Sequence, residues 1–171
     1  DNQYVSTEPV SNLPRGYLSV SQVAQYMKCG EAYRRRYVLE QPVPTRGIMV
    51  QGRAIHKAAE KLHLSMIEKN PVAVGAMLQA YSDLYDTEIA EIDLALEEQP
   101  LGGLKDEGIK LTVLYHGVAL GKGKDDATAL PLPPVVPVAA EKAFRVILKP
   151  ENSEPVPFVG IIDLEEDVAI A

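Results

Sequence analysis

The chain has a single cysteine, Cys29, among its 171 residues. One thiol excludes an internal disulfide, and such low use of cysteine favours a reducing compartment, so we expect a cytoplasmic protein. No apolar run reaches the length needed to cross a bilayer, which predicts that the protein has no membrane segment. The first residues also lack the basic region and apolar core of a secretory signal.

Several common chemical motifs are missing as well. The sequence contains no P-loop, no dinucleotide-binding fingerprint and no nucleophile elbow. Cys29 has no Cys or His partner at zinc spacing, so a structural zinc site is not expected. His56 and His63 are seven residues apart. That spacing is roughly 10 Å along a helix axis, which is too far for the two side chains to share one ion easily.

The charge of the chain is unevenly distributed. A net charge of -7 argues, at face value, against a protein that binds nucleic acid. Residues 28–63 nevertheless carry eight Lys or Arg against three Glu, which gives this segment a charge of +5. A basic face on an acidic body is compatible with a groove for a polyanion. A solvated helix face is the commoner meaning of such a run, and this alternative stays open.

The order of the hydrophobic patterns predicts an α+β fold. Residues 1–17 are polar and rich in turn formers, which predicts an extended lead-in, and residues 18–171 are predicted to form a single domain. This domain is expected to have a helical part at 18–120, a loop at 121–137 and strands at 138–171. The first two strands form an antiparallel hairpin. Because a two-stranded hairpin is marginal alone, more strands are expected, and residues 168–171 predict a third.

Local signals predict where the helices begin and end. Ser19 and Gln22 form a capping box at the start of the first helix. A second short helix from Glu31 directs Tyr33 and Tyr37 inward and its arginines partly outward. Three longer helices are predicted at about 48–68, 72–97 and 106–120. The pair Asn70-Pro71 predicts the start of the second of these, 100–103 is predicted to be a break, and Gly108 and Gly117 weaken the last helix.

The helix at 48–68 carries a histidine beside a glycine. A stripe with helical spacing predicts its inward face, and consists of Met49, Gly52, His56, Ala59, His63 and Met66. Because Gly52 lies one turn before His56, we expect another backbone to approach the imidazole closely there. A histidine beside cleared space indicates a ligand or catalytic group. A satisfied core histidine is the alternative.

Asp163 is the second unusual residue, because it lies in an otherwise apolar strand. A carboxylate buried there must be paired, hydrogen-bonded or bound to a metal, since burying it alone is costly. The alternative is a strand end at which the carboxylate meets solvent. Glu141 on the preceding strand can face the same side of the hairpin. One imidazole and two carboxylates are ligands suited to Mg²⁺ or Mn²⁺.

Five segments in this order resemble the front of a PD-(D/E)XK nuclease of the RecB/AddB exonuclease branch, which includes CRISPR adaptation nucleases and phage relatives. They are residues 18–22, Tyr26 with Cys29 and Tyr33, residues 52–56, residues 141–144 and residues 160–163. The resemblance implies a restriction-endonuclease-like mixed sheet and metal-dependent hydrolysis of DNA. It implies that His56 and Asp163 bind the catalytic metal, and that Glu141 is a further residue of the catalytic site, outside these two ligands.

The sequence departs from this family after Asp163. The family's next strand supplies a D/E-x-K element, whose carboxylate completes the metal site and whose lysine orients or activates water. Residues 164–171 contain no lysine, so we expect a truncated chain that is itself inactive. Cys29 is followed by Gly30, where relatives often have proline. In iron–sulfur members this cysteine is the first of four ligands, so a cluster is expected only in a longer parent protein.

These observations lead to one main hypothesis and two alternatives. The main hypothesis is a divalent-metal-dependent DNA exonuclease domain that acts in recombination, repair or phage DNA processing, with DNA and a helicase or recombination protein as partners and no membrane. The side chains expected on the phosphate backbone are Arg34, Arg35, Arg36, Arg53 and Lys57. The alternatives are a non-catalytic nucleic-acid-binding or scaffold domain with the same fold, and an α+β interaction module in which the candidate site residues are structural.

Overall fold

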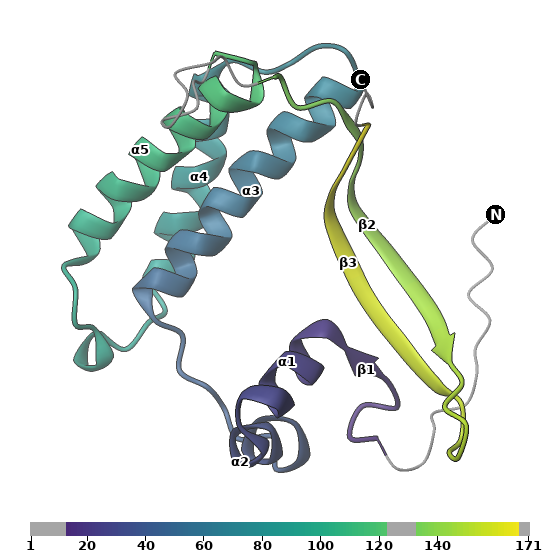
Figure 1. The fold of residues 1–171 in the computed structure, drawn as a ribbon. Coiled ribbons are helices and arrows are strands. Elements are labelled where there is room, and N and C mark those ends of the chain that lie inside the picture. The colour runs from purple at the N-terminus through teal and green to yellow at the C-terminus, as the bar shows by residue number, and fades with distance from the viewer. Residues whose placement is uncertain (1–12, 123–132, 168–171) are drawn as a thin grey trace, which may run out of the picture. The chain divides into compact units, whose positions relative to one another are not determined.

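A computed structural model describes residues 13–122 and 133–167 (Figure 1). In chain order its elements are β1 (Leu18–Ser19), α1 (Val20–Lys28), α2 (Gly30–Tyr33), the π-helical turn η1 (Arg34–Val38), α3 (Gly47–Ile67), α4 (Val74–Ile89), the 3₁₀ turn η2 (Leu94–Leu96), α5 (Leu101–Ala119), β2 (Pro137–Leu148) and β3 (Val156–Glu166). The strands form a three-stranded sheet in the order β1-β3-β2. This arrangement confirms the predicted α+β class.

The chain divides into two compact units. The first spans residues 1–43 and 143–162, and the second spans residues 44–142 and 163–171. The hairpin of β2 and β3 contributes to both. The assignment of residues 18–171 to one domain therefore stays a prediction. None of the helices in the described part of the chain combines the length and the apolarity that crossing a bilayer requires.

The first unit contains the parallel pairing of the sheet. β1 runs parallel to β3, with Leu18 opposite Phe158 and Ser19 opposite Val159. The third strand of the described sheet thus precedes α1, whereas the strand predicted at 168–171 lies outside the described residues. The capping box is confirmed, because the Gln22 amide donates to Ser19 Oγ and the Ser19 amide donates to Gln22 Oε1.

The short helices of the first unit also follow the sequence pattern. Tyr37 is buried and Tyr33 is partly buried, while the three arginines between them are exposed. The Tyr33 and Tyr37 rings lie 5.1 Å apart, and the Tyr26 ring meets Tyr33 edge-on. The predicted inward tyrosines and outward arginines are confirmed.

In the second unit, α3, α4 and α5 lie side by side around one apolar core (Figure 1). Its buried residues are Val50, Ala54, Ala58, Leu62, Met77, Tyr81, Tyr85, Leu104 and Ala119. The predicted inward stripe of α3 is wrong in its first half, because Met49, Gly52 and His56 are exposed, whereas its second half is buried or partly buried, with His63, Ala59 and Met66. The buried face is instead the one on which Val50, Ala54, Ala58 and Leu62 recur every four residues. Both rows have helical spacing, and contact with α4 and α5 together selects the second row.

The predicted start of α4 is wrong, because Asn70 belongs to the end of α3. Lys69 has a φ of 59°, its amide donates to the Met66 carbonyl, and the Asn70 amide donates to the Ser65 carbonyl. These two bonds form a Schellman motif, which satisfies the last carbonyls of α3. Since Asn70 is committed there, it caps nothing downstream, and α4 begins only at Val74.

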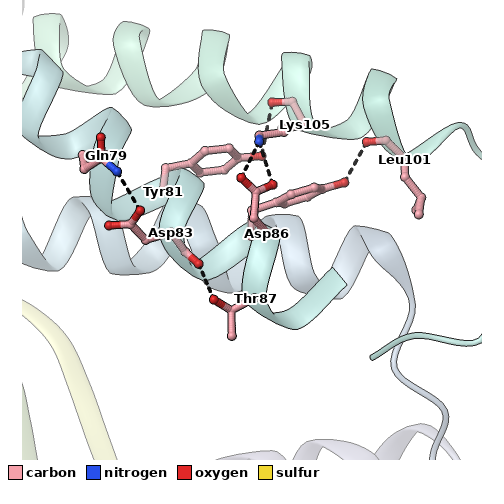
Figure 2. A network of polar contacts seen from close by, with 8 residues as sticks. Gln79, Tyr81, Asp83, Asp86, Thr87, Leu101 and Lys105 are labelled. Atoms are coloured by element: carbon pink, nitrogen blue, oxygen red, sulfur yellow. Dashed lines mark hydrogen bonds and ion pairs between the residues drawn. The ribbon is translucent and has the colours of Figure 1, made fainter. Parts of the chain in front are cut away.

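The other predicted helix boundaries also need correction. α4 ends at Ile89, well before residue 97, and α5 begins at Leu101, so residues 100–103 are no break. Gly108 lies within α5 at a contact point between helices, where a larger residue does not fit. A Cβ atom there would lie 2.0 Å from the Tyr81 hydroxyl oxygen. Tyr81 donates to the Lys105 carbonyl, and the Lys105 ammonium binds Asp86 (Figure 2).

Candidate metal centre

His56 lies on the exposed side of α3, which is held in the second unit by polar contacts as well as by its core face. The Gln51 side chain is buried and donates to the Leu104 carbonyl over 2.6 Å. The Gly47 amide at the start of the helix donates to Glu97 over 2.8 Å. These bonds fix the helix against α5 and its preceding loop. The His56 side chain is 46% exposed, so it is not a buried core histidine.

Glu141 meets His56 from β2. Its carboxylate oxygen Oε1 lies 2.6 Å from His56 Nε2. The residue has a φ of 53°, in the left-handed region that residues other than glycine rarely adopt. Ala139, Ala140 and Glu141 are all partly buried, so the in-and-out alternation of the strand is lost here. A local break in the pleat changes the direction of a side chain, which is how β-bulges re-aim residues near functional sites.

Asp163 completes the group from β3. Its Oδ1 lies 3.9 Å from His56 Nε2, and its side chain is 72% exposed. The expectation of a buried carboxylate is therefore wrong, and the solvent-facing alternative describes its burial correctly. The Asp163 carboxylate is nevertheless both exposed to solvent and close to His56. The carboxylate is therefore accessible to a ligand from solvent.

The three side chains fit a divalent cation. One ligand atom from each of His56, Glu141 and Asp163 lies within 4.8 Å of the other two. Ligands about 2.1 Å from Mg²⁺ are about 3 to 4 Å apart in octahedral geometry, so small side-chain rotations suffice. One imidazole nitrogen and two carboxylate oxygens are donor types that divalent metal ions use in proteins. This group can therefore hold a divalent metal.

The basic residues predicted to bind DNA have partners within the protein. In the first unit, Arg34 and Arg35 bind Glu31, and these bonds lower the pKa of Glu31 to about 2. Arg36 lies over the ring of Tyr37. In the second unit, Arg53 binds Glu88 and Lys57 binds Glu60. Contacts of these five side chains with phosphate stay a prediction. Cys29 is exposed, and the chain has no second cysteine.

The structure also contains a cavity that the sequence did not reveal. It has a volume of about 620 Å³ and lies in the second unit, bounded by α3, α5 and the adjoining parts of β2 and β3. His56, Glu141 and Asp163 all line it, together with His63 and Tyr115. His63 Nε2 lies 2.6 Å from the Tyr115 hydroxyl oxygen. Burial lowers the pKa of His63 and raises that of Tyr115. The only sequence feature that pointed to the pair of His63 and Tyr115 was the position of His63, two turns after His56.

The predicted role of Gly52 is wrong. A Cβ atom at this position would meet nothing within 4 Å, so no backbone approaches His56 through the gap. The contact with the hairpin is made by the long side chain of Glu141 instead. Gly52 only lines the open cavity.

The site residues all lie within a segment that matches a known family. A family model described as the PD-(D/E)XK nuclease superfamily matches residues 17–169. Comparisons with curated proteins and with solved structures gave no match. Members of this superfamily are divalent-metal-dependent nucleases, which agrees with the donor set found here. The chain belongs to the PD-(D/E)XK nuclease superfamily.

Proposed function

We propose that the chain supplies metal ligands of a Mg²⁺- or Mn²⁺-dependent DNA exonuclease domain of the RecB/AddB type, acting in DNA recombination, repair or phage DNA processing. The observation that carries this proposal is the meeting of His56, Glu141 and Asp163, whose ligand atoms lie within 4.8 Å of one another. The order of the segments 52–56, 141–144 and 160–163 supports the RecB/AddB branch. A helicase or recombination protein is the proposed partner.

Each residue of the site has a distinct role in this proposal. His56 offers the lone pair of Nε2, and Asp163 offers a carboxylate oxygen that already faces solvent. Glu141 hydrogen-bonds the same Nε2 in the absence of an ion, so metal binding would replace this bond, and the released carboxylate would offer a second ligand oxygen. A divalent ion bound by such ligands polarises the scissile phosphate and lowers the pKa of a bound water molecule.

Phosphate binding by Arg53 and Lys57 requires that they exchange their present partners. The Arg53 and Lys57 side chains are 44% and 53% exposed, and they pair with Glu88 and Glu60, which are 29% and 20% exposed. Exposed ion pairs contribute only about 0 to 1 kcal/mol, so exchange of a glutamate for a phosphate costs little. The same argument applies to Arg34 and Arg35 in the first unit. Such contacts give affinity without sequence preference and weaken as salt rises.

Titration with Mn²⁺ tests the metal centre directly, by calorimetry or by the electron paramagnetic resonance signal of the free ion. We expect one ion to bind, and we expect His56→Ala and Asp163→Asn to weaken binding about tenfold or more. His116→Ala is the matched control, because His116 bonds the Val72 carbonyl outside the site. Binding that both site variants leave unchanged would refute the metal assignment.

The 171-residue chain is proposed to cleave DNA weakly or not at all. The sequence after Asp163 offers no lysine that can position a water molecule. Strong Mg²⁺-dependent degradation of DNA by this chain, abolished by His56→Ala, would contradict that proposal. A non-catalytic binding domain is the alternative, and it predicts DNA affinity that does not depend on the divalent metal.

A further inference from the structure

The cavity beside the metal centre is polar at one end and apolar along its walls. His56, Glu141 and Asp163 lie at the polar end. The apolar walls come from two helices and one strand, and consist of Ile55, Ala59, Leu111, Leu114, Val118 and Leu164. On α5, Leu111 is 42% exposed and Leu114 is 63% exposed, so the described residues leave this wall open to solvent. A volume of about 620 Å³ is ample for a single planar ring system.

A nucleotide has the same division into a charged part and an apolar part. Its phosphate carries the negative charge that a metal centre attracts, and its base presents two flat apolar faces. A base enters a cavity of this kind only after it has left the base stack, which costs least when the nucleotide is already unpaired. Contact of such a base with apolar and aromatic side chains then stabilises the complex without sequence preference.

We propose that this cavity receives one base of an unpaired nucleotide whose phosphate lies at the metal centre. The inference rests on the proposed function and adds to it a contact with one base, made by side chains of α3 and α5 outside the metal centre. Leu114 and its neighbours on α5 cover one side of the base, and Ala59 on α3 faces the same space.

His63 and Tyr115 act as positioning residues in this arrangement. Their rings lie 5.7 Å apart at an angle of 74°, and the bond between His63 Nε2 and the Tyr115 hydroxyl holds the phenol ring in place. His63 is 5% exposed, so its side chain is fixed by the surrounding helices. Tyr115 thereby lines the cavity with its hydroxyl group held by His63.

Two variants of adjacent residues separate the cavity wall from the general surface of α5. Leu114→Glu places a charge in the cavity. Val113→Glu places the same charge at a neighbouring position of α5, where the wild-type valine is 46% exposed and does not line the cavity. Both positions are exposed enough for the helix to tolerate glutamate, and circular dichroism verifies the fold. Ala59→Phe fills the same cavity from α3 and provides a second, independent variant.

The probes are single-stranded oligonucleotides that carry either 2-aminopurine or an abasic site at the terminal nucleotide, placed at each end in turn and bound in the presence of Ca²⁺. We expect the abasic oligonucleotide to bind about tenfold more weakly than the intact one at one of the two ends. The 2-aminopurine emission should change on binding at that same end. Leu114→Glu and Ala59→Phe should abolish the difference, and Val113→Glu should keep it.

The outcomes distinguish this inference from the proposed function. Equal affinity for intact and abasic ends in the wild-type protein overturns the cavity assignment, and so does a difference that both cavity variants retain. Base-dependent affinity in a chain that binds no Mn²⁺ refutes the metal centre and leaves the cavity assignment standing. Normal Mn²⁺ binding in Leu114→Glu, with loss of the base dependence, supports both.

Discussion

His56 Nε2 and Glu141 Oε1 are 2.6 Å apart, although the two residues are separated by 85 positions in the chain. Glu141 reaches this position with a φ of 53°, a backbone conformation that glycine adopts far more readily. A strained residue persists only when its surroundings fix it, and such residues cluster at functional sites. The backbone of β2 is thus strained, and locally less stable, at Glu141, the residue that contacts His56.

The first prediction concerns this strain. Left-handed backbone costs an L-residue about 1 to 2 kcal/mol, so Glu141→Gly should be more stable than Glu141→Ala by about 1 kcal/mol in urea unfolding. At the next residue, Lys142, whose φ is not positive, the order should reverse, because glycine weakens an ordinary strand. Both variants of Glu141 should bind Mn²⁺ more weakly than the wild-type protein. A Glu141→Ala protein as stable as Glu141→Gly would show that the backbone there is not strained.

The second prediction compares two glycines of α5. Gly108→Ala should destabilise the protein by roughly 1 to 3 kcal/mol, as overpacking does in a core. The reason is that the new Cβ would lie 2.0 Å from the Tyr81 hydroxyl oxygen and 2.5 Å from Tyr81 Cζ. Gly117→Ala meets nothing within 4 Å and should stabilise the helix by about 0.5 to 1 kcal/mol. Urea unfolding measures both, and a shift of the same sign in the two variants would contradict the packing argument.

Features with local causes were predictable from the sequence. The Ser19 capping box depends on residues three positions apart, and it occurs as predicted. The inward face of α3 was not predictable, because two rows of residues have equal helical spacing and only contact with α4 and α5 distinguishes them. Asn70 failed as a start signal for a similar reason, since the end of α3 uses it first. A local sequence pattern does not show which of two competing roles a residue takes in the folded protein.

The candidate site shows the same limit. His56, Glu141 and Asp163 were grouped from their residue types, their strand positions and a family resemblance, and the structure brings their ligand atoms together. His63 and Tyr115 were not grouped, because 52 residues separate them and neither belongs to a motif. The close approach expected at Gly52 failed because a glycine clears space without showing what fills it.

The third prediction tests Gly52. Since a Cβ atom there meets nothing, Gly52→Ala should stabilise α3 by about 0.5 to 1 kcal/mol through its higher helix propensity. Mn²⁺ binding should stay unchanged, because His56 and Glu141 meet without using the gap. Thermal unfolding and the Mn²⁺ titration provide the two measurements. Weaker Mn²⁺ binding in Gly52→Ala would restore a role for the space beside His56.

The fourth prediction follows from the lowered pKa of His63. Burial lowers this pKa below its usual value of 6.5, the charge of His56 acts in the same direction, and Glu166 and Glu141 partly oppose it. His63 therefore binds a proton more readily in the unfolded chain than in the folded protein. At pH values above the pKa that His63 has in the unfolded chain, the imidazole is neutral in both states, so its titration does not lower the free energy of unfolding. As pH falls below this pKa, the unfolded state gains protons first and the free energy of unfolding decreases.

Replacement of His63 isolates this contribution. His63→Gln keeps a polar side chain beside Tyr115 but does not titrate, so its free energy of unfolding should fall less than that of the wild-type protein between about pH 7 and about pH 5. His116→Gln serves as the control for replacement of a histidine outside the cavity, where the side chain bonds the Val72 carbonyl. The other titrating groups are common to all three proteins, so their contributions cancel in the comparison. An equal decrease in His63→Gln and wild type would mean that the buried imidazole accepts its proton without unfolding the helices around it.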